Sequence, residues 1–383
     1  MSVGLRIVIA PDKFKGSLAA KAVAAAIESG FRRVFPDAVY ERIPVADGGD
    51  GTAQTLVDCL GGRIIEATVT GPDGKSRRAA YALLSDGRTA IVELAQASGL
   101  ALLEPGSNEP LAATTYGTGE LIAAAIDAGA VRVIVAIGGS ATNDAGSGAL
   151  SALGAKFLDA EGRRLPPGGA SLSRLNAIDT SALERRLRNV SVELASDVKN
   201  PLCGPSGAAA VYGPQKGASP EQTALLDAAL WHFADVVLAH SGADIRNVPG
   251  AGAAGGTGGG FLALARATLR PGAQLVLELI EFDRRLQGAD LVVTGEGRLD
   301  RQSFAGKAPL AVAAAAKRRG IPAVAIAGSV DCPAAALRDA GIWSAFPIAP
   351  GPISLLEALL RAEELTANAA ERLAGAIHIA LRG

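Results

Sequence analysis

The stretch LRIVIAPDKFKGSLAAKAVAAAIESGFRRVF, residues 5–35, combines an apolar run, a polar turn and a long Ala-rich segment. Its first part, Leu5–Ala10, predicts a buried strand, and Ala19–Phe35 predicts a helix. A second strand over Tyr40–Val45 and a second helix over Gly51–Leu60 follow. Strands and helices that alternate at this spacing indicate a parallel sheet with crossover helices.

The same rhythm returns in the last hundred residues. The patterns there predict, in order, strand Leu291–Thr294, helix Pro309–Lys317, strand Ala323–Ala327, helix Ala334–Ala340, strand Ser344–Pro347 and a C-terminal helix over Ser354–Leu381. We therefore expect residues 1–65 and 285–383 to form one discontinuous, doubly wound α/β domain with a mostly parallel sheet of the Rossmann or flavodoxin type.

Residues 66–284 have a different character and predict an inserted, mixed α/β domain. Three short strands separated by turns that contain Pro72-Asp73-Gly74 and Ser85-Asp86-Gly87 indicate an antiparallel meander near its start. Further helices and strands are expected at Gly119–Ala128, Val131–Ile137, Ser147–Leu153, Val190–Ala195, Glu221–Leu238 and Phe261–Leu269.

Composition excludes several classes of protein. With 49% hydrophobic and 20% charged residues, the chain has enough apolar material for a core, which excludes disorder throughout. The 37 basic and 38 acidic residues nearly cancel, and no basic stretch indicates a nucleic-acid or membrane partner. Three scattered Cys without a CxxC pattern support neither a disulfide framework nor a Cys zinc site. We expect a cytoplasmic protein whose partners are small molecules.

Five predicted strands lead into polar turns that each contain a carboxylate. These turns are 11–17, 46–52, 138–144, 196–201 and 295–300. One such turn is ordinary helix capping, but five at the carboxyl ends of strands, where α/β sheets bind ligands, indicate a site. Gly-rich turns at helix starts, lysines and carboxylates suit phosphoryl transfer. Gly138, Gly139, Ser140 and Asn143 form the candidate phosphate loop, with a tight structural turn as the alternative.

Two nucleotide motifs match only superficially. Residues 250–255 read GAGAAG and fit GxGxxG, but the preceding Arg246–Pro249 is no buried strand, so an anion-binding or packing loop is favoured. Gly306-Lys307 resembles the end of a P-loop but lacks the upstream glycine and the following hydroxyl residue. A Walker loop is therefore absent.

At these same turns the sequence resembles the bacterial glycerate kinase family, type I. The resemblance rests on PDKFKGSL (11–18), PVADGGDGT (44–52), IGGSATNDAGSG (137–148), ASDVKNPLCGPSGAAAVYGPQKGA (195–218), GAGAAGGTGGG (250–260) and LVVTGEGRLDRQSFAGKAP (291–309). Lys13 and Asp50 stand where Ser and Glu are common in the family, and both keep the position polar.

The resemblance implies ATP-dependent phosphorylation of D-glycerate with Mg²⁺, with 2-phosphoglycerate favoured over 3-phosphoglycerate as product. It also implies two α/β domains with the active site in the cleft between them. The alternatives are a nicotinamide-dependent hydroxy-acid oxidoreductase and a non-enzymatic sugar-acid-binding regulator. The misplaced GxGxxG pattern argues against the first, and the lack of a DNA-binding element argues against the second. A monomer or homodimer is expected.

The candidate roles follow from the chemistry of glycerate, an anion with two hydroxyls. The catalytic candidates are Asp197, Glu296 and Asp300, with Asp197 also the candidate Mg²⁺ ligand. The substrate-binding candidates are Lys15, Ser17, Asp47 and Arg298, of which Lys15 and Arg298 offer charge to the carboxylate. Lys307 joins the phosphate loop as a nucleotide-binding candidate.

Overall fold

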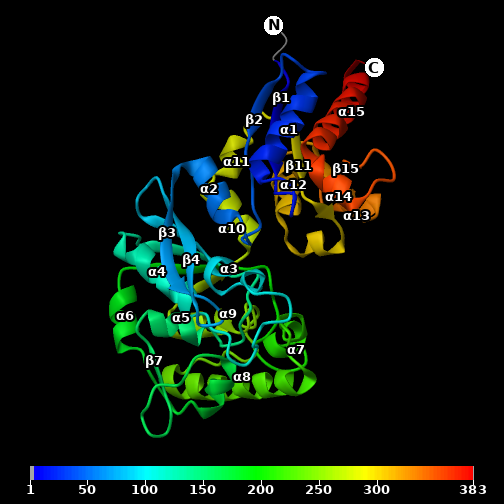
Figure 1. Cartoon of the computed structure of the whole chain (residues 1–383). Coiled ribbons are helices and arrows are strands. Elements are labelled where there is room, and N and C mark those ends of the chain that lie inside the picture. Colours follow the sequence, from blue (N-terminus) through cyan, green and yellow to red (C-terminus); the bar gives the residue numbers. More distant parts are fainter. Residues whose placement is uncertain (1–3, 383) are drawn as a thin grey trace. The chain divides into compact units, whose positions relative to one another are not determined.

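The computed structural model describes residues 4–382, which divide into two compact units (Figure 1). Unit 1 comprises the chain up to Asp47 and from Gly272 on, and unit 2 comprises Gly48–Pro271. The boundaries predicted near residues 65 and 285 thus lie some distance after the observed ones. Packing explains both differences. Helix α2 (Thr52–Leu60) lies against strands β3 (Gly62–Thr70) and β4 (Ser76–Leu84) of unit 2, whereas α10 (Gly272–Leu279) lies against α12 (Ala308–Arg318) of unit 1.

Unit 1 contains a five-stranded sheet in the order β15-β13-β11-β1-β2, and all its strand pairs are parallel. Its elements are β1 (Arg6–Pro11), α1 (Ala20–Arg32), β2 (Val39–Arg42), α10 (Gly272–Leu279), α11 (Phe282–Arg285), β11 (Leu291–Gly295), β12 (Arg298–Leu299), η4 (Arg301–Ala305), α12 (Ala308–Arg318), β13 (Ala323–Ala327), β14 (Ser329–Val330), α13 (Ala334–Asp339), β15 (Ile342–Pro347), α14 (Leu355–Leu360) and α15 (Ala362–Arg382). The predicted parallel α/β architecture is confirmed.

The centre of this sheet is apolar on both faces. Strands β1 and β11 pair from Ile7 opposite Leu291 to Pro11 opposite Gly295, and these residues are buried. Helices α1 and α15 lie side by side over one face (Figure 1), where they pack with Ile7, Ile9 and Val293. Near-continuous apolar strands are typical of a parallel sheet that is covered on both faces.

Unit 2 contains a six-stranded mixed sheet in the order β10-β9-β6-β5-β4-β3. Strands β3, β4 and β5 are antiparallel, as the meander pattern predicts, and the remaining pairs are parallel. Its elements are α2 (Thr52–Leu60), β3 (Gly62–Thr70), β4 (Ser76–Leu84), β5 (Thr89–Glu93), α3 (Leu94–Ser98), η1 (Leu100–Leu102), α4 (Tyr116–Asp127), β6 (Arg132–Ala136), α5 (Ser147–Ala152), β7 (Lys156–Leu158), η2 (Gly169–Arg174), β8 (Ala177–Asp179), α6 (Ser181–Leu187), β9 (Ser191–Ala195), α7 (Ala208–Tyr212), η3 (Pro214–Lys216), α8 (Pro220–Ser241), α9 (Thr257–Leu264) and β10 (Thr268–Arg270).

Two predicted helices differ from the structure. The helix expected over Phe261–Leu269 ends at Leu264, because Arg266 has a positive φ of 51° that a helix does not accommodate. The chain then forms β10, which pairs with β9. The C-terminal helix expected over Ser354–Leu381 is two helices, α14 and α15, separated at Arg361.

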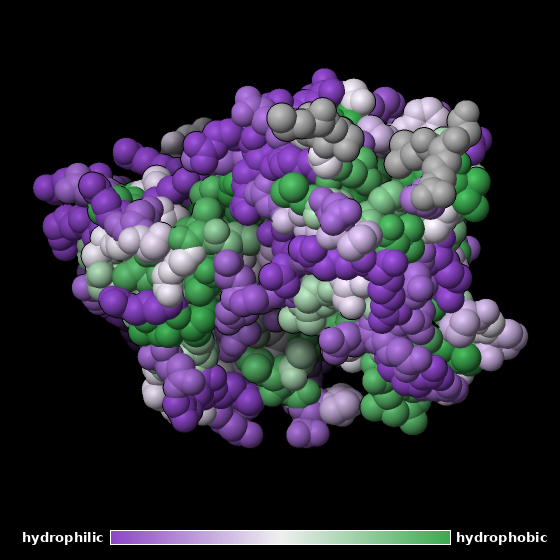
Figure 2. Space-filling view, turned by 90° about the horizontal axis from the view of Figure 1, so that it is seen from above, coloured by the Kyte–Doolittle hydropathy of each residue, from purple (hydrophilic) through white to green (hydrophobic). Residues whose placement is uncertain are grey.

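No described helix is long and apolar enough to cross a membrane. Figure 2 shows hydrophilic residues spread over the displayed face and interspersed with smaller hydrophobic areas.

The contact between α1 and α15 depends on Gly30, where an added Cβ would lie 2.2 Å from the carbonyl oxygen of Ala367. We predict that Gly30→Ala lowers the free energy of unfolding by roughly 1–3 kcal/mol, the usual cost of overpacking. This cost outweighs the gain of up to about 1 kcal/mol that Ala brings to a helix interior. Thermal denaturation of the purified variant measures the effect.

Gly375 in α15 provides the matched control, because an added Cβ there meets no atom within 4 Å. Gly375→Ala should therefore keep the propensity gain and raise the melting temperature. Equal rises for both variants would show that α1 and α15 do not pack as closely as the structure has them.

Candidate functional site

The strand order of unit 1 predicts where this unit binds a ligand. From β1 the chain passes to β2 on one side, whereas β11, β13 and β15 extend the sheet on the other. In open α/β sheets, ligands bind at the carboxyl ends of the strands where the strand order reverses. Here that position lies between β1 and β11, so the turns that follow these two strands are the expected site.

Backbone hydrogen bonds hold these turns together. The Asp12 N–H donates to the Gly295 carbonyl at 2.8 Å, and the Gly328 N–H donates to the Glu296 carbonyl at 3.1 Å. Gly295 is required at the end of β11, because a Cβ there would lie 1.9 Å from the Ile326 carbonyl oxygen. The loops after β1, β11 and β13 therefore form one rigid edge.

A cavity of about 350 Å³ opens at this edge of unit 1. Its polar lining is Asp12, Lys13, Lys15, Ser17, Asp47, Glu296, Arg298, Lys307 and Ser329, and its apolar lining includes Phe14, Ile348, Leu355, Ala358, Leu359 and Ala362. Six residues singled out from the sequence thus line one cavity: Lys15, Ser17, Asp47, Glu296, Arg298 and Lys307. The structure brings together all four predicted substrate-binding residues.

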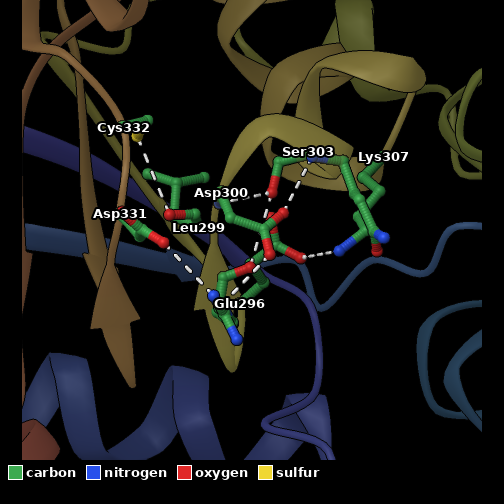
Figure 3. Close-up of polar contacts among 9 residues, drawn as sticks. Glu296, Leu299, Asp300, Ser303, Lys307, Asp331 and Cys332 are labelled. Atoms are coloured by element: carbon green, nitrogen blue, oxygen red, sulfur yellow. Dashed lines mark hydrogen bonds and ion pairs between the residues drawn. The ribbon is translucent and has the colours of Figure 1, made fainter.

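Glu296 and Lys307 form an ion pair in this cavity. The Glu296 carboxylate follows β11 and is 6% exposed, and its Oε2 accepts a hydrogen bond from Lys307 Nζ at 3.1 Å (Figure 3). Burial raises the pKa of Glu296, while the Lys307 ammonium and a Ser303 hydrogen bond oppose that rise. The ion pair therefore offsets only part of the effect of burial on this carboxylate.

Asp12, the first polar residue after β1, lines this cavity but was not among the candidates from the sequence. Its side chain is 7% exposed, and burial followed by the negative charge of Asp47 raises its pKa to about 7. The backbone N–H of Lys13 donates to Asp12 Oδ1 at 2.6 Å and partly opposes the rise. A carboxyl with a pKa near neutrality can accept or donate a proton at physiological pH.

Asp300 lies outside the cavity lining and has the contacts of a helix cap. Its Oδ1 accepts from the Gln302 N–H at 2.8 Å, and its own N–H donates to Ser303 Oγ at 3.0 Å (Figure 3). Its Oδ2 lies 3.1 Å from Arg298 Nε, and Arg298 also contacts Asp331. A catalytic role for Asp300 stays a prediction, and its observed contacts favour a structural one.

The remaining candidates lie in unit 2 at the edge of the other sheet. Strands β6 and β9 are parallel neighbours, so the loop that contains Gly138–Asn143 and the turn with Asp197 leave the same edge. Gly138 and Gly139 are exposed, and Asp197 is half-buried. Ser140 Oγ accepts from the buried Nζ of Lys216 at 2.9 Å, a contact that the sequence pattern did not reveal.

The GxGxxG stretch of residues 250–255 packs against this edge of unit 2. An added Cβ at Gly255 would lie 1.9 Å from the Thr142 carbonyl oxygen, and one at Gly252 would lie 2.2 Å from that of Pro201. The glycines therefore let two stretches of backbone approach closely. This packing role agrees with the sequence pattern, which favours a loop over a dinucleotide fingerprint.

Asp12 makes stability depend on pH. Because its pKa is about 7 in the folded chain, against 3.8 for an unperturbed Asp, the folded state binds the extra proton between these pH values. The contribution of Asp12 to the free energy of unfolding is therefore largest below pH 3.8, and it is lost as the pH rises through 7. We predict that Asp12→Asn gains stability over the parent by on the order of 2 kcal/mol between pH 5 and pH 8.

Melting temperatures of both proteins at each pH test this, with Asp339→Asn, an exposed carboxylate on α13, as the control. A constant difference between the Asp12→Asn variant and its parent across this range would contradict the prediction.

Comparisons with known proteins show the family to which the chain belongs. The sequence profile of the Glycerate kinase family matches residues 7–378. The chain is 50% identical to "Glycerate kinase" of Bacillus subtilis (strain 168) over 376 residues, which cover 98% of each chain. It is 43% identical to "Glycerate 2-kinase" of Escherichia coli (strain K12) over 378 residues, which cover 99% of each.

Among solved structures, the chain is similar to a crystal structure described as a putative glycerate kinase 2 from Salmonella typhimurium LT2. The TM-score is 0.90 at 44% sequence identity, and the match covers 99% of this chain and 100% of that one. The family profile and the relatives each extend over nearly the whole sequence. This chain belongs to the glycerate kinase family.

Proposed function

We propose that this kinase transfers the γ-phosphoryl group of ATP to the 2-hydroxyl of D-glycerate, forming 2-phosphoglycerate and ADP. The observation that carries the proposal is the cavity of unit 1, where lysines and carboxylates gather at the carboxyl ends of β1 and β11. The name of the Escherichia coli relative, "Glycerate 2-kinase", supports the choice of the 2-hydroxyl. Because the chain belongs to a kinase family, the oxidoreductase and regulator alternatives are set aside.

We assign glycerate to this cavity because its lining matches an anion with two hydroxyls. The Lys15 ammonium and the Arg298 guanidinium offer positive charge to the substrate carboxylate. Ser17 Oγ is buried, and within residues 4–382 it has no hydrogen-bond partner, so it is free to bond a substrate oxygen. A buried hydroxyl without a partner costs free energy that a bound ligand recovers.

Asp12 is our candidate general base. As the 2-hydroxyl oxygen attacks the γ-phosphorus, a new O–P bond forms and the bond from that phosphorus to the bridging oxygen of ADP breaks. The hydroxyl proton passes to the Asp12 carboxylate. A base is most effective when its pKa lies near the working pH, as that of Asp12 does. Asp47 contributes by raising this pKa.

The loop Gly138–Asn143 and Asp197 are assigned to the phosphates and to Mg²⁺. Among residues 4–382 no three His, Cys, Asp or Glu side chains gather closely enough to hold a metal ion. Mg²⁺ in kinases is commonly held by one or two carboxylates together with phosphate oxygens and water, so a single Asp197 at the edge of the loop fits this pattern. When bound, the ion offsets negative charge on the phosphates. We propose a cytoplasmic monomer or homodimer.

The reaction itself is tested with purified protein, ATP, Mg²⁺ and D-glycerate, followed by phosphorus NMR of the product. We expect ADP and a 2-phosphoglycerate signal, and much slower ADP release with L-lactate. A site that bonds a substrate hydroxyl rejects the analogue that lacks it by large factors. A 3-phosphoglycerate signal would overturn the regiochemistry, and equal turnover of lactate would overturn the substrate.

Two carboxylate variants separate the proposed base from the proposed metal ligand. Asp12→Asn should lower kcat by roughly 10²–10⁴-fold, because base catalysis has this magnitude, and should leave the Mg²⁺ concentration for half-maximal rate unchanged. Asp197→Asn should raise that Mg²⁺ concentration at least several-fold. Steady-state rates over a Mg²⁺ series measure both quantities.

Asp339→Asn serves again as the exposed control and should match the parent in both measurements. A parental kcat in a folded Asp12→Asn variant would remove Asp12 as the base, and Glu296 would be tested next. An unchanged Mg²⁺ requirement in Asp197→Asn would remove Asp197 from the metal site.

A further inference from the structure

Lys216 is a buried cation fixed to the loop that follows β6. It ends η3 and is 3% exposed. Its Nζ donates to Ser140 Oγ at 2.9 Å and to the Thr142 carbonyl at 2.7 Å. These two contacts join a lysine to a loop that lies far away in the sequence.

Asn108 makes a second connection between the same two segments. Its Nδ2 donates to the Lys216 carbonyl at 2.6 Å and to the Ala141 carbonyl at 3.2 Å. Side chain and backbone of Lys216 are thus both fixed relative to the loop. The ammonium therefore has one defined position beneath residues 140–142.

Several polar groups around this ammonium lack partners in the described chain. An ammonium has three donors, and Lys216 uses two of them. Asn143 is fully buried, and both its Nδ2 and its Oδ1 are without a partner, as is Thr142 Oγ1. In addition, no acceptor pairs with the loop N–H groups of Gly138, Gly139, Ser140, Thr142 and Asn143 in residues 4–382. Native proteins rarely leave buried side-chain polar groups such as those of Asn143 and Thr142 unpaired unless a ligand or water meets them.

Burial lowers the pKa of Lys216 from 10.5 to about 7, so its protein neighbours alone do not hold it fully charged at neutral pH. The charged group that faces it is Asp144, which lies beyond ion-pair distance in the described chain. The Asp144 carboxylate already accepts from the N–H and Oγ1 of Thr115 and from the N–H groups of Gly146 and Gly148. Burying an ammonium without a directly bonded carboxylate is costly, and a neutral side chain would hold the same two acceptors at lower cost.

We propose that Lys216 is the cation of a phosphate-binding loop, where it holds residues 140–142 and supplies positive charge to a phosphate anion bound at the unpaired N–H groups of residues 138–143. Successive backbone N–H groups in a glycine-containing turn form a concave binding site for anions, and a lysine beneath it completes the charge balance. Gly138 and Gly139 are exposed, so an anion in solvent can reach the loop at these residues.

The class of ligand follows from these donors. Five N–H groups and one ammonium match an anion with several oxygens, such as the phosphate chain of a nucleoside triphosphate. The identification of that nucleotide as ATP rests on the proposed function. The presence of an oxyanion site rests on the geometry of unit 2 alone.

The test compares the parent with Lys216→Met, which keeps an unbranched stem and removes the charge. Calorimetric titrations use ATP, tripolyphosphate and adenosine. We expect the variant to bind ATP and tripolyphosphate at least tenfold more weakly and to bind adenosine within twofold of the parent. A merely structural lysine would change all three affinities together.

Lys75→Met is the matched control, because Lys75 is an exposed lysine in the same unit, at the turn between β3 and β4. It should bind all three ligands like the parent. A folded Lys216→Met variant with parental affinity for ATP and tripolyphosphate overturns the proposal, as does an equal loss for adenosine.

Thermal melting shows first whether Lys216→Met is folded. If it is not, Lys216→Gln replaces it, since its amide keeps hydrogen-bond donors without the charge. A parent protein that fails to bind tripolyphosphate overturns the proposal without any variant. A parent that binds tripolyphosphate but does not phosphorylate glycerate overturns the proposed function and leaves the oxyanion site standing.

Discussion

The parallel pairing of β1 with β11 is the constraint on which the rest of unit 1 depends. The two strands come from opposite ends of the sequence, and the whole of unit 2 lies between them in the chain. The entropy lost in closing such a long loop grows only slowly with its length, so the burial of two apolar strands can offset it. Once they pair, the turns after Pro11 and Gly295 meet at one edge, and the cavity lining follows from that meeting.

The electrostatic environment distinguishes carboxylates that occupy similar positions in the sequence. Each of Asp12, Glu296 and Asp300 follows soon after a buried strand, yet each has a different environment. Asp300 uses its oxygens in a cap and a contact with a guanidinium, and Glu296 pairs with Lys307, which offsets part of the rise that burial gives its pKa. Asp12 accepts a hydrogen bond from the backbone N–H of Lys13, but burial and the negative charge of Asp47 outweigh it and raise the pKa of Asp12 to about 7. Burial and partners, rather than residue type, separate the role of a base from that of a cap.

Sequence patterns predicted the strands and the parallel sheet well because apolar runs such as Leu5–Ala10 and Ala323–Ala327 are signals local to the chain. They located the turns that carry Lys15, Asp47 and Glu296 for the same reason. Features that depend on distant contacts were not predictable. The assignment of α2 to unit 2 is set by packing on a sheet formed later in the chain, and the role of Lys216 depends on a loop 76 residues away. A lysine in a Gly-rich segment carries no sequence signal that distinguishes a buried ammonium from a solvated one.

The two sites differ in how they hold charge, and this difference has a physical cause. In unit 1, acids and bases share one cavity, so a shift in the charge of Asp47 or Lys307 changes the pKa of a neighbour. In unit 2, the polar groups of residues 138–143 are mostly backbone N–H groups, which do not titrate. Their positions are fixed by hydrogen bonds from Lys216 and Asn108 and by close packing of Gly255 against the backbone of Thr142. A site made of fixed dipoles needs no reorganisation when an anion binds, whereas a cavity of coupled acids can move a proton. The phosphoryl transfer that we propose uses both properties, and each comes from a different part of the sequence.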